Sequence, residues 1–312
     1  MDVLNDIIDT LDLKGALYFR TDFSPPFAIG VPRYEQAARF HLVVQGRCFV
    51  TLASGEIIEL SAGDLILIPA GASHILASGP DDRAVPLETV IAESGFRGTG
   101  VFSLGKRDSA ASTQMVCGHF SFRAGADHPL LRALPDHLIV TNALRAKNPW
   151  LDDVLRLMIK QIFSDPDNSA ATVTRLSEVI FIETLRASAE QAPDLEKTLG
   201  ALKHRQIGDA LLLMHERLNE PWTMEKLAAA VGMSRSKFAE TFRQSVGIAP
   251  MTYLTEWRIQ KAISLLTASQ KSVQQVAAET GYQSPAAFTR TFSQKMGVSP
   301  KEYRRQDVAT LH

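Results

Sequence analysis

Two short stretches near the C-terminus carry polar and small side chains whose spacing suits contact with DNA bases. In both, the residues recur every three or four positions, which places them on one face of a helix. The first face consists of Ser236, Ala239, Glu240 and Arg243, and the second of Ala286, Thr289, Arg290 and Ser293. Short or hydrogen-bonding side chains on such a face fit the major groove, where base edges offer donors and acceptors. The alternative interpretation is two solvated faces of an ordinary helical domain.

The two faces belong to an internal repeat. The stretch that begins at Leu227 reads LAAAVGMSRSKFAETFRQSVGIAPMTYL, and the stretch that begins at Val276 reads VAAETGYQSPAAFTRTFSQKMGVSPKEYR. Each copy predicts a small-residue helix, a glycine turn and a second helix, which is a helix-turn-helix. Two matched copies favour a chain that reads DNA with two helices.

Local signals predict where the second helix of each copy begins and ends. Ser234 is the expected N-cap in the first copy, and Ser284 followed by Pro285 fills the same role in the second. Phenylalanines four residues apart predict the buried stripe of both helices, and a glycine predicts each helix end: Phe238, Phe242, Gly247, Phe288, Phe292 and Gly297. Between the copies, the apolar spacing of residues 250–267 predicts a helix roughly 27 Å long, near the ~34 Å between successive major grooves on one DNA face.

These residues resemble the AraC/XylS family of bacterial transcription regulators from residue 207 to residue 305. The matching motifs are Arg258-x-x-x-Ala262-x-x-Leu265-Leu266, Val276-Ala277, Gly281-Tyr282, Phe288-x-x-x-Phe292 and Gly297-x-Ser299-Pro300-x-x-Tyr303-Arg304. The resemblance implies that the second helix of each copy enters the major groove. The DNA-binding candidates are Arg235, Ser236, Lys237, Ala239, Glu240, Arg243, Ser284, Pro285, Ala286, Thr289, Arg290 and Arg304. Ala239 and Ala286 are smaller than the side chains that many family members carry there, so thymine methyl groups are their expected contacts.

Charge and cysteine content agree with a DNA-binding protein of the cytoplasm. The chain has 312 residues and a net charge of −1. Residues 205–306 contain 14 Lys and Arg against 8 Asp and Glu, whereas residues 1–204 contain 19 against 25. Basic charge on the repeat fits phosphate binding. Two cysteines without a CxxC pair predict no disulfide framework, and no stretch is apolar for long enough to span a membrane.

Short β-rich runs separated by glycine turns predict a sandwich or small barrel over residues 16–125. Within them, Gly63-x5-Pro69-x-Gly71-x2-His74 looks like the second signature of the cupin barrel, with His74 pointing inward. The first cupin signature, H-x-H with a later glutamate, is missing, because only His41 lies near the matching strand and Arg39 stands near the expected glutamate position. The N-terminal region thus resembles the cupin-type sensor domain that precedes many AraC-type DNA-binding domains.

His41 and His74 are the ligand-binding candidates of this domain. They could face one cavity, with Cys48, Cys117 or His119 nearby in the fold. Two imidazoles and a thiolate would suit zinc, so a metal site is one alternative, and two packed core histidines are another. Without the first signature, we expect a small-molecule pocket, no metal and no cofactor, and no enzymatic activity.

Residues 149–190 change to a helical rhythm and predict a helical hairpin with more apolar surface than a lone pair needs. Family resemblance suggests dimerisation through these helices, for which Leu155 and Leu176 are the expected contacts. The alternative is that the helices pack only on their own barrel. The segment QAPDLEKTLG, with Pro193 and Gly200, is interpreted as the linker that follows.

The sequence therefore predicts an α+β multidomain protein. The expected parts are a cupin-like ligand-sensing β-barrel at 1–148, a dimerisation hairpin and linker at 149–204, and an all-α double helix-turn-helix domain at 205–306. The expected partners are double-stranded promoter DNA, an unidentified small-molecule effector and a second copy of the chain, with RNA polymerase as a further candidate. The alternative function is a cupin-type enzyme or metal sensor fused to a DNA-binding module.

Overall fold

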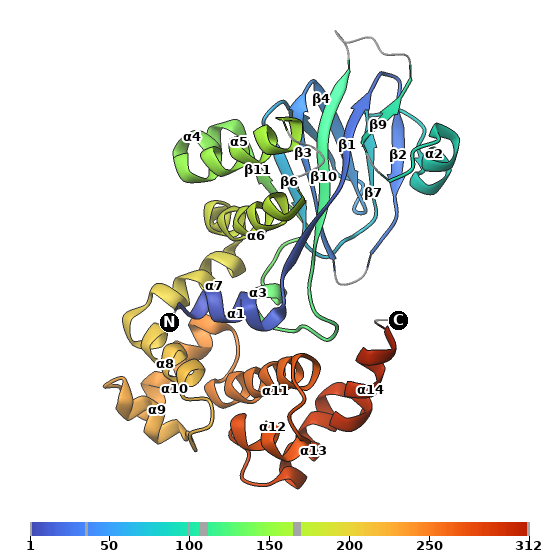
Figure 1. Cartoon of the computed structure of the whole chain (residues 1–312). Coiled ribbons are helices and arrows are strands. Elements are labelled where there is room, and N and C mark those ends of the chain that lie inside the picture. The colour runs from blue at the N-terminus through green and yellow to red at the C-terminus, as the bar shows by residue number, and fades with distance from the viewer. Residues whose placement is uncertain (1, 35–36, 99, 106–111, 165–169, 311–312) are drawn as a thin grey trace. The chain divides into compact units, whose positions relative to one another are not determined.

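The computed structural model describes residues 2–34, 37–98, 100–105, 112–164 and 170–310, which form two compact units (Figure 1). The β-rich unit comprises Leu13–Phe122 and Leu134–Ala192. The helical unit comprises Met1–Asp12, Arg123–Ala133 and Pro193–His312. The helical unit thus includes two segments from the N-terminal part of the sequence that lie far from the repeat along the chain. In the described part of the chain, no helix is both long and apolar enough to cross a membrane.

Eleven strands of the β-rich unit form two sheets. Their order is β11-β6-β3-β10-β1-β9 in the six-stranded sheet and β5-β4-β7-β2-β8 in the five-stranded sheet. The strands are β1 Lys14–Phe23, β2 Ala28–Val31, β3 Ala37–Gln45, β4 Arg47–Leu52, β5 Ile57–Ser61, β6 Leu65–Ile68, β7 His74–Ala77, β8 Val85–Pro86, β9 Val101–Leu104, β10 Thr113–Ser121 and β11 Leu138–Val140. The expected cupin-like β structure is therefore confirmed, built from two sheets.

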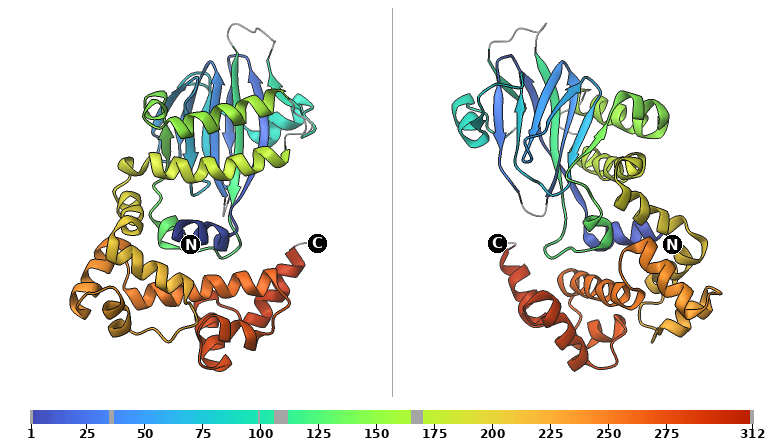
Figure 2. Two further views of the ribbon diagram at one scale, coloured as in Figure 1. Left: turned by 60° about the vertical axis from the view of Figure 1, so that its left-hand side comes forward. Right: turned by 180° about the vertical axis from the view of Figure 1, so that it is seen from behind.

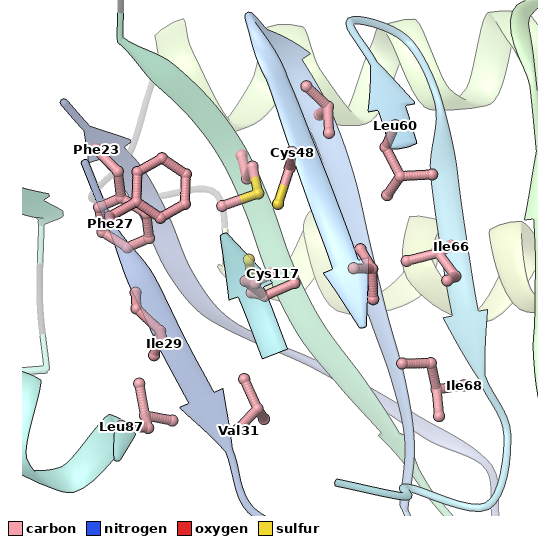
Figure 3. Close-up of a cluster of buried hydrophobic side chains, with 14 of the residues drawn as sticks. Phe23, Phe27, Ile29, Val31, Cys48, Leu60, Ile66, Ile68, Leu87 and Cys117 are labelled. Atoms are coloured by element: carbon pink, nitrogen blue, oxygen red, sulfur yellow. The ribbon is translucent and has the colours of Figure 1, made fainter. Parts of the chain in front are cut away.

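The core of this unit lies between the two sheets (Figure 3). Apolar side chains from both sheets fill it, among them Phe23 and Met115 from one sheet and Ile29 and Val50 from the other. Strand β4 alternates buried and more exposed residues, as expected for a sheet with one wet face, whereas β3 and β6 are buried along most of their length.

Helices cover the outer face of the six-stranded sheet (Figure 2). Helix α6 (Ala170–Ala187) packs on β1 and β10, and α5 (Pro149–Ser164) packs on α6. Close approach of α6 to β1 depends on Gly15, where a Cβ atom would lie 1.8 Å from Ser177 Oγ. Short elements complete the unit: α2 Leu87–Ser94, α4 Asn142–Lys147 and the 3₁₀ helix η1 Ala189–Gln191.

The helical unit contains the repeat. Its helices are α1 Val3–Leu11, α3 Pro129–Arg132, α7 Pro193–Lys203, α8 Arg205–Glu216, α9 Met224–Ala230, α10 Arg235–Val246, α11 Pro250–Ala268, α12 Val273–Glu279, α13 Pro285–Met296 and α14 Pro300–Thr310. Helices α9 and α10 form the first helix-turn-helix, and α12 and α13 form the second. Helix α11 lies between them in sequence and buries Trp257, Ile259 and Ile263. The all-α double helix-turn-helix predicted from the repeat is confirmed.

The segment interpreted as a linker has a different structure. Residues 193–203 form α7, whose Leu195 and Leu199 are buried in the helical unit. Proline at the first position of a helix is well tolerated because its missing N–H has no intrahelical partner there, so Pro193 begins this helix instead of breaking it. The boundaries of the two compact units also differ from those of the three expected parts. Residues 149–192 belong to the β-rich unit.

Candidate DNA interface and sensor pocket

The second helix of each copy is fixed by its caps and by its buried stripe. The Ser234 hydroxyl accepts from the Lys237 N–H in α10, and the Ser284 hydroxyl accepts from the Ala287 N–H in α13. Both helices end at a glycine with positive φ, as predicted. The four phenylalanines that form the inner stripes are fully buried, namely Phe238, Phe242, Phe288 and Phe292. The opposite faces of α10 and α13 are thereby turned outward.

Most of the predicted base-reading side chains lie on these outward faces. Ala239 and Thr289 are half-buried, and the other candidates on α10 and α13 and at their caps are exposed: Arg235, Ser236, Lys237, Glu240, Arg243, Ser284, Pro285, Ala286 and Arg290. A glutamate on the reading face can accept a hydrogen bond from cytosine N4, and an arginine can donate two to guanine. The two faces therefore combine donors, acceptors and small apolar side chains.

Several charges on the first face are already engaged with neighbours. Arg235 forms an ion pair with Glu225 of α9 at 2.9 Å, and Lys237 lies 3.8 Å from Glu240. Both pairs are exposed, and exposed pairs contribute little to stability in water. Arg235 and Lys237 can consequently exchange these carboxylates for phosphate at small cost.

Arg304 has a different environment from the one expected for a phosphate contact. Its Nε donates to the carbonyl of Leu266 at 3.1 Å, and its Nη2 donates to the carbonyl of Lys271 at 2.5 Å. These carbonyls end α11 and precede α12, so the guanidinium ties α14 to the connection between the copies. This role was not predicted from the sequence, because the two carbonyls lie more than 30 positions before Arg304.

His41 and His74 meet inside the β-rich unit, as predicted. Their Nε2 atoms are 2.8 Å apart, and both side chains are buried. His74 stands at the start of β7 because Gly71 turns the chain with φ +58°, where a Cβ atom would lie 2.2 Å from the Tyr34 carbonyl oxygen. Arg39 and Cys117 line the same small cavity as His41.

The hydrogen-bond partners of the two histidines determine their tautomers. His74 Nδ1 lies 2.9 Å from the carbonyl oxygen of Ala72, which can only accept, so the proton of neutral His74 is on Nδ1. His74 Nε2 therefore accepts from the Nε2–H of His41. Neutral His41 then presents an unprotonated Nδ1, and no protein donor in the described part of the chain reaches this buried atom.

Burial keeps two histidines and two thiols of this interior neutral. It lowers the pKa of His74 to about 4, and it lowers the pKa of His41 well below its usual value, with the neighbouring His74 and Arg39 lowering it further. Burial also raises the pKa of Cys48 to about 12 and raises the pKa of Cys117. Thiols of this kind are weak nucleophiles and poor metal ligands, since both roles require the thiolate.

Two cavities of this unit differ in character. The cavity beside His41 measures about 20 Å³ and is walled mostly by apolar side chains. An open cleft of about 790 Å³ is lined mainly by polar residues, which include the exposed Arg47 and Glu59 and the half-buried Asp82. Within the described ranges, no group of three or more His, Cys, Asp and Glu is arranged to hold a metal ion.

Comparison with known proteins identifies both parts of the chain. Residues 2–190 match the family described as Cupin, and residues 227–306, which include both copies of the repeat, match the family described as Helix-turn-helix domain. The HTH-type transcriptional regulator AlkR of Acinetobacter baylyi is 30% identical over 310 residues, which cover 98% of this chain and 100% of AlkR. The chain belongs to the AraC-type family of helix-turn-helix transcription regulators.

Other relatives agree with this assignment. A putative AraC-like transcription regulator of Streptomyces antibioticus is 29% identical and matches 99% of this chain and all of its own length. Among solved structures, the DNA-binding domain of AdpA in complex with a target DNA is 36% identical, covering 33% of this chain and 93% of that domain, with a TM-score of 0.32. The two family matches and the full-length relatives show that this AraC-type protein is a DNA-binding transcription regulator with a cupin-like N-terminal domain.

Proposed function

We propose that this regulator reads promoter DNA by placing α10 and α13 in successive major grooves. The outward faces of both helices support this arrangement, as does α11, whose 19 residues span roughly 28 Å. Arg290 on α13 is the proposed base contact to guanine, and Arg235, Lys237 and Arg243 are proposed to contact phosphate or bases through α10. Promoter binding and the cysteine content both support a cytoplasmic protein.

The β-rich unit is proposed to sense a small molecule beside His41. The observation that carries this proposal is the buried acceptor His41 Nδ1, which belongs to a residue that lines a small, mostly apolar cavity. Because a buried acceptor without a donor costs about 1–3 kcal/mol, a molecule that supplies one N–H or O–H gains most at this atom. The proposed effector is therefore a mainly apolar compound with one hydrogen-bond donor, and it must enlarge the present cavity to enter.

Catalysis by the β-rich unit is not part of this proposal. The two histidines are neutral and the thiols are protonated, so the thiols are weak nucleophiles. This chemistry supports a sensor.

The effector proposal is tested by thermal unfolding with matched pairs of probes. Benzyl alcohol and cyclohexanol each carry a hydroxyl donor. Toluene and cyclohexane are the corresponding hydrocarbons, which have the same rings and lack the hydroxyl. We expect the alcohols to raise the unfolding temperature of the wild type more than the hydrocarbons do. His41→Leu should abolish this difference, and His137→Gln, which changes a histidine outside the cavity, should preserve it. If the difference between alcohols and hydrocarbons persists in His41→Leu and disappears in Arg47→Ala, the effector binds in the open cleft and the proposal is wrong.

The protein is also proposed to work as a homodimer through α5. The structure corrects the expected contacts, because Leu155 is fully buried in the core of its own unit and is not available to a partner. Trp150 and Leu157 are instead exposed by 62% and 49%, and their seven-residue spacing places them on one helix face. Two large apolar side chains on an exposed face support pairing with the same face of a second copy. Contact with RNA polymerase stays a prediction.

A further inference from the structure

Tyrosines at matched positions of the two repeat copies hold the same short segment of the chain. Tyr253 and Tyr303 each follow a helix-initiating proline by three residues. The Tyr303 hydroxyl donates to the carbonyl of Ala124 at 2.6 Å, and the Tyr253 hydroxyl oxygen lies 3.2 Å from His128 Nε2. Residues 123–133, which follow β10, are therefore attached to both copies.

Tyr253 belongs to a series of hydrogen bonds in which each side chain donates to the next one. His128 Nδ1 accepts from the Leu130 N–H, so its proton is on Nε2 and is donated to Tyr253. Tyr253 donates to His215 Nε2 at 2.7 Å, and His215 Nδ1–H donates to Asp6 Oδ2 at 2.8 Å. Burial lowers the pKa values of His128 and His215, which keeps both rings neutral as this order requires.

This series of hydrogen bonds ends at Asp6 of helix α1. The second oxygen of Asp6 accepts from Lys261 Nζ at 2.6 Å, so α1 is bound to α8 through His215 and to α11 through Lys261. The Arg123 N–H also donates to the carbonyl of Leu11 at 2.9 Å, which joins α1 to residues 123–133. The two N-terminal segments of the helical unit thus form one connected structure.

Residues 123–133 also approach the second copy too closely for other side chains. Gly125 has φ +73°, and a Cβ atom there would lie 2.8 Å from Met296 Cε and 3.2 Å from Tyr303 Oη. Its carbonyl accepts from Gln260 of α11 at 3.2 Å. Arg132 pairs with Glu256, which also pairs with Lys295 of α13 at 3.1 Å. The segment therefore reaches both α11 and the reading helix α13.

We propose that α1 and residues 123–133 form a clasp that sets the separation of the two reading helices. The clasp contacts Tyr253 at the N-terminal end of α11, whose ring packs on Phe242 of α10, and it contacts Tyr303 in α14 of the second copy. The clasp therefore adds a second connection between the start of α11 and the second copy, beside the continuous chain of α11. The restraint selects the distance between the two half-sites that the protein reads on DNA. This inference concerns DNA spacing and is independent of the effector proposed above.

The test compares operators of different spacing, using the full-length protein. A duplex that the wild type binds is first selected from a random library, and a second duplex carries one base pair inserted between its two footprinted half-sites. We expect Tyr253→Phe and Tyr303→Phe to weaken binding to the selected duplex roughly twofold to tenfold, the usual effect of one lost hydrogen bond. The affinity ratio is the affinity for the selected duplex divided by the affinity for the duplex with the inserted base pair. Both variants should also reduce this ratio, because a looser clasp tolerates the altered spacing.

Tyr282→Phe is the matched control, since Tyr282 lies in the second copy and packs edge-to-face against Phe288 outside the clasp. It should leave the affinity ratio unchanged. A ratio that is the same in the wild type, Tyr253→Phe and Tyr303→Phe would overturn the clasp. Failure to select any preferred duplex would count against DNA reading itself, so the two failures are distinguishable.

A second pair of variants changes the clasp without removing a hydroxyl. Gly125→Ala introduces a methyl group against Met296 and should lower the affinity ratio as the tyrosine variants do. Gly95→Ala places the same strain on a glycine with φ +68° that has open space around it in the β-rich unit, and it should not change the ratio. An unchanged ratio in a folded Gly125→Ala protein would contradict the proposal.

Discussion

The side chains of His41 and His74 show how burial determines chemistry at the scale of single residues. The two rings hydrogen-bond to each other, and His74 also donates to the Ala72 carbonyl. No carboxylate is among the causes that shift the pKa of either ring. One expectation from the sequence was that both histidines face one cavity. Their direct hydrogen bond and the open acceptor on His41 were not predicted, because a tautomer depends on the partner of the other ring nitrogen.

Acid should destabilise the protein through these histidines. The pKa of His74 is about 4 in the folded protein and about 6.5 in an unfolded chain. Below pH 6.5 the unfolded state binds a proton that the folded state does not, so stability is present above pH 6.5 and is lost as pH falls toward 4. We expect a loss of about 1.4 kcal/mol in the free energy of unfolding per pH unit for this group.

Urea unfolding at pH 7.5 and 5.5 measures this slope. His74→Gln should show a smaller difference between the two pH values than the wild type. Equal pH dependence in His74→Gln and the wild type would show that His74 already titrates in the folded state with an ordinary pKa.

Arg290 and Arg304 should behave differently although both are arginines of the second copy. Arg290→Ala should reduce discrimination at one base pair by about 1–3 kcal/mol, because two hydrogen bonds to guanine are lost. Arg304→Ala should instead lower the unfolding temperature, since its guanidinium holds two backbone carbonyls. Binding titrations against single-base variants of the selected duplex, together with thermal unfolding, separate these effects.

The exposed Lys301 supplies the comparison for phosphate contacts. If Lys301 neutralises one phosphate, Lys301→Ala should reduce the slope of log affinity against log salt by about one. A uniform loss of affinity for Arg290→Ala, with base preference intact, would assign Arg290 to the DNA backbone.

At the scale of elements, local sequence signals were sufficient to locate a helix that has its own capping residues and its own buried apolar stripe. The repeat, the two N-cap serines and the phenylalanine pairs located α10 and α13 to the residue. Helix α7 was missed because Pro193 was interpreted as a break and Gly200 as a linker residue. The burial of Leu195 and Leu199 against the helical unit outweighs these weak preferences.

Helix α5 carries the prediction for assembly. Leu157→Glu places a charge on the exposed apolar face and should convert a dimer into a folded monomer with weaker operator binding. Lys160→Glu, which changes a charge on an exposed position of the same helix, is the control and should stay dimeric. Sedimentation at micromolar concentration measures the state, and a monomeric wild type would contradict the proposal.

At the scale of the whole molecule, the sequence predicted the two kinds of domain and not their division of the chain. Helix α1 belongs to the helical unit, and this position was not predicted from the sequence. Asp6 and Lys261 are 255 positions apart, and no local pattern encodes such a pair. The same reason hid the roles of His128 and Arg304.

Asp6 tests whether the N-terminal helix stabilises the C-terminal repeat. Burial alone would raise the pKa of Asp6, but hydrogen bonds from His215 and Lys261 more than offset this and lower it. Asp6→Ala leaves both partners without their acceptor and should cost about 2 kcal/mol in the free energy of unfolding. Asp9→Ala, in the same helix and bonded to Asn5, should cost far less. Similar losses in the two variants would show that the His215 and Lys261 contacts add little.

The position of α1 has a consequence for synthesis. The ribosome makes α11, one of the partners of α1, about 250 residues after α1 itself, which takes roughly 10 to 50 s at bacterial rates of elongation. During that interval the apolar face of α1 lacks part of its native surface. The helical unit can be completed only after the second copy of the repeat has left the ribosome, so a nascent chain that ends before the second copy carries no finished DNA-binding surface.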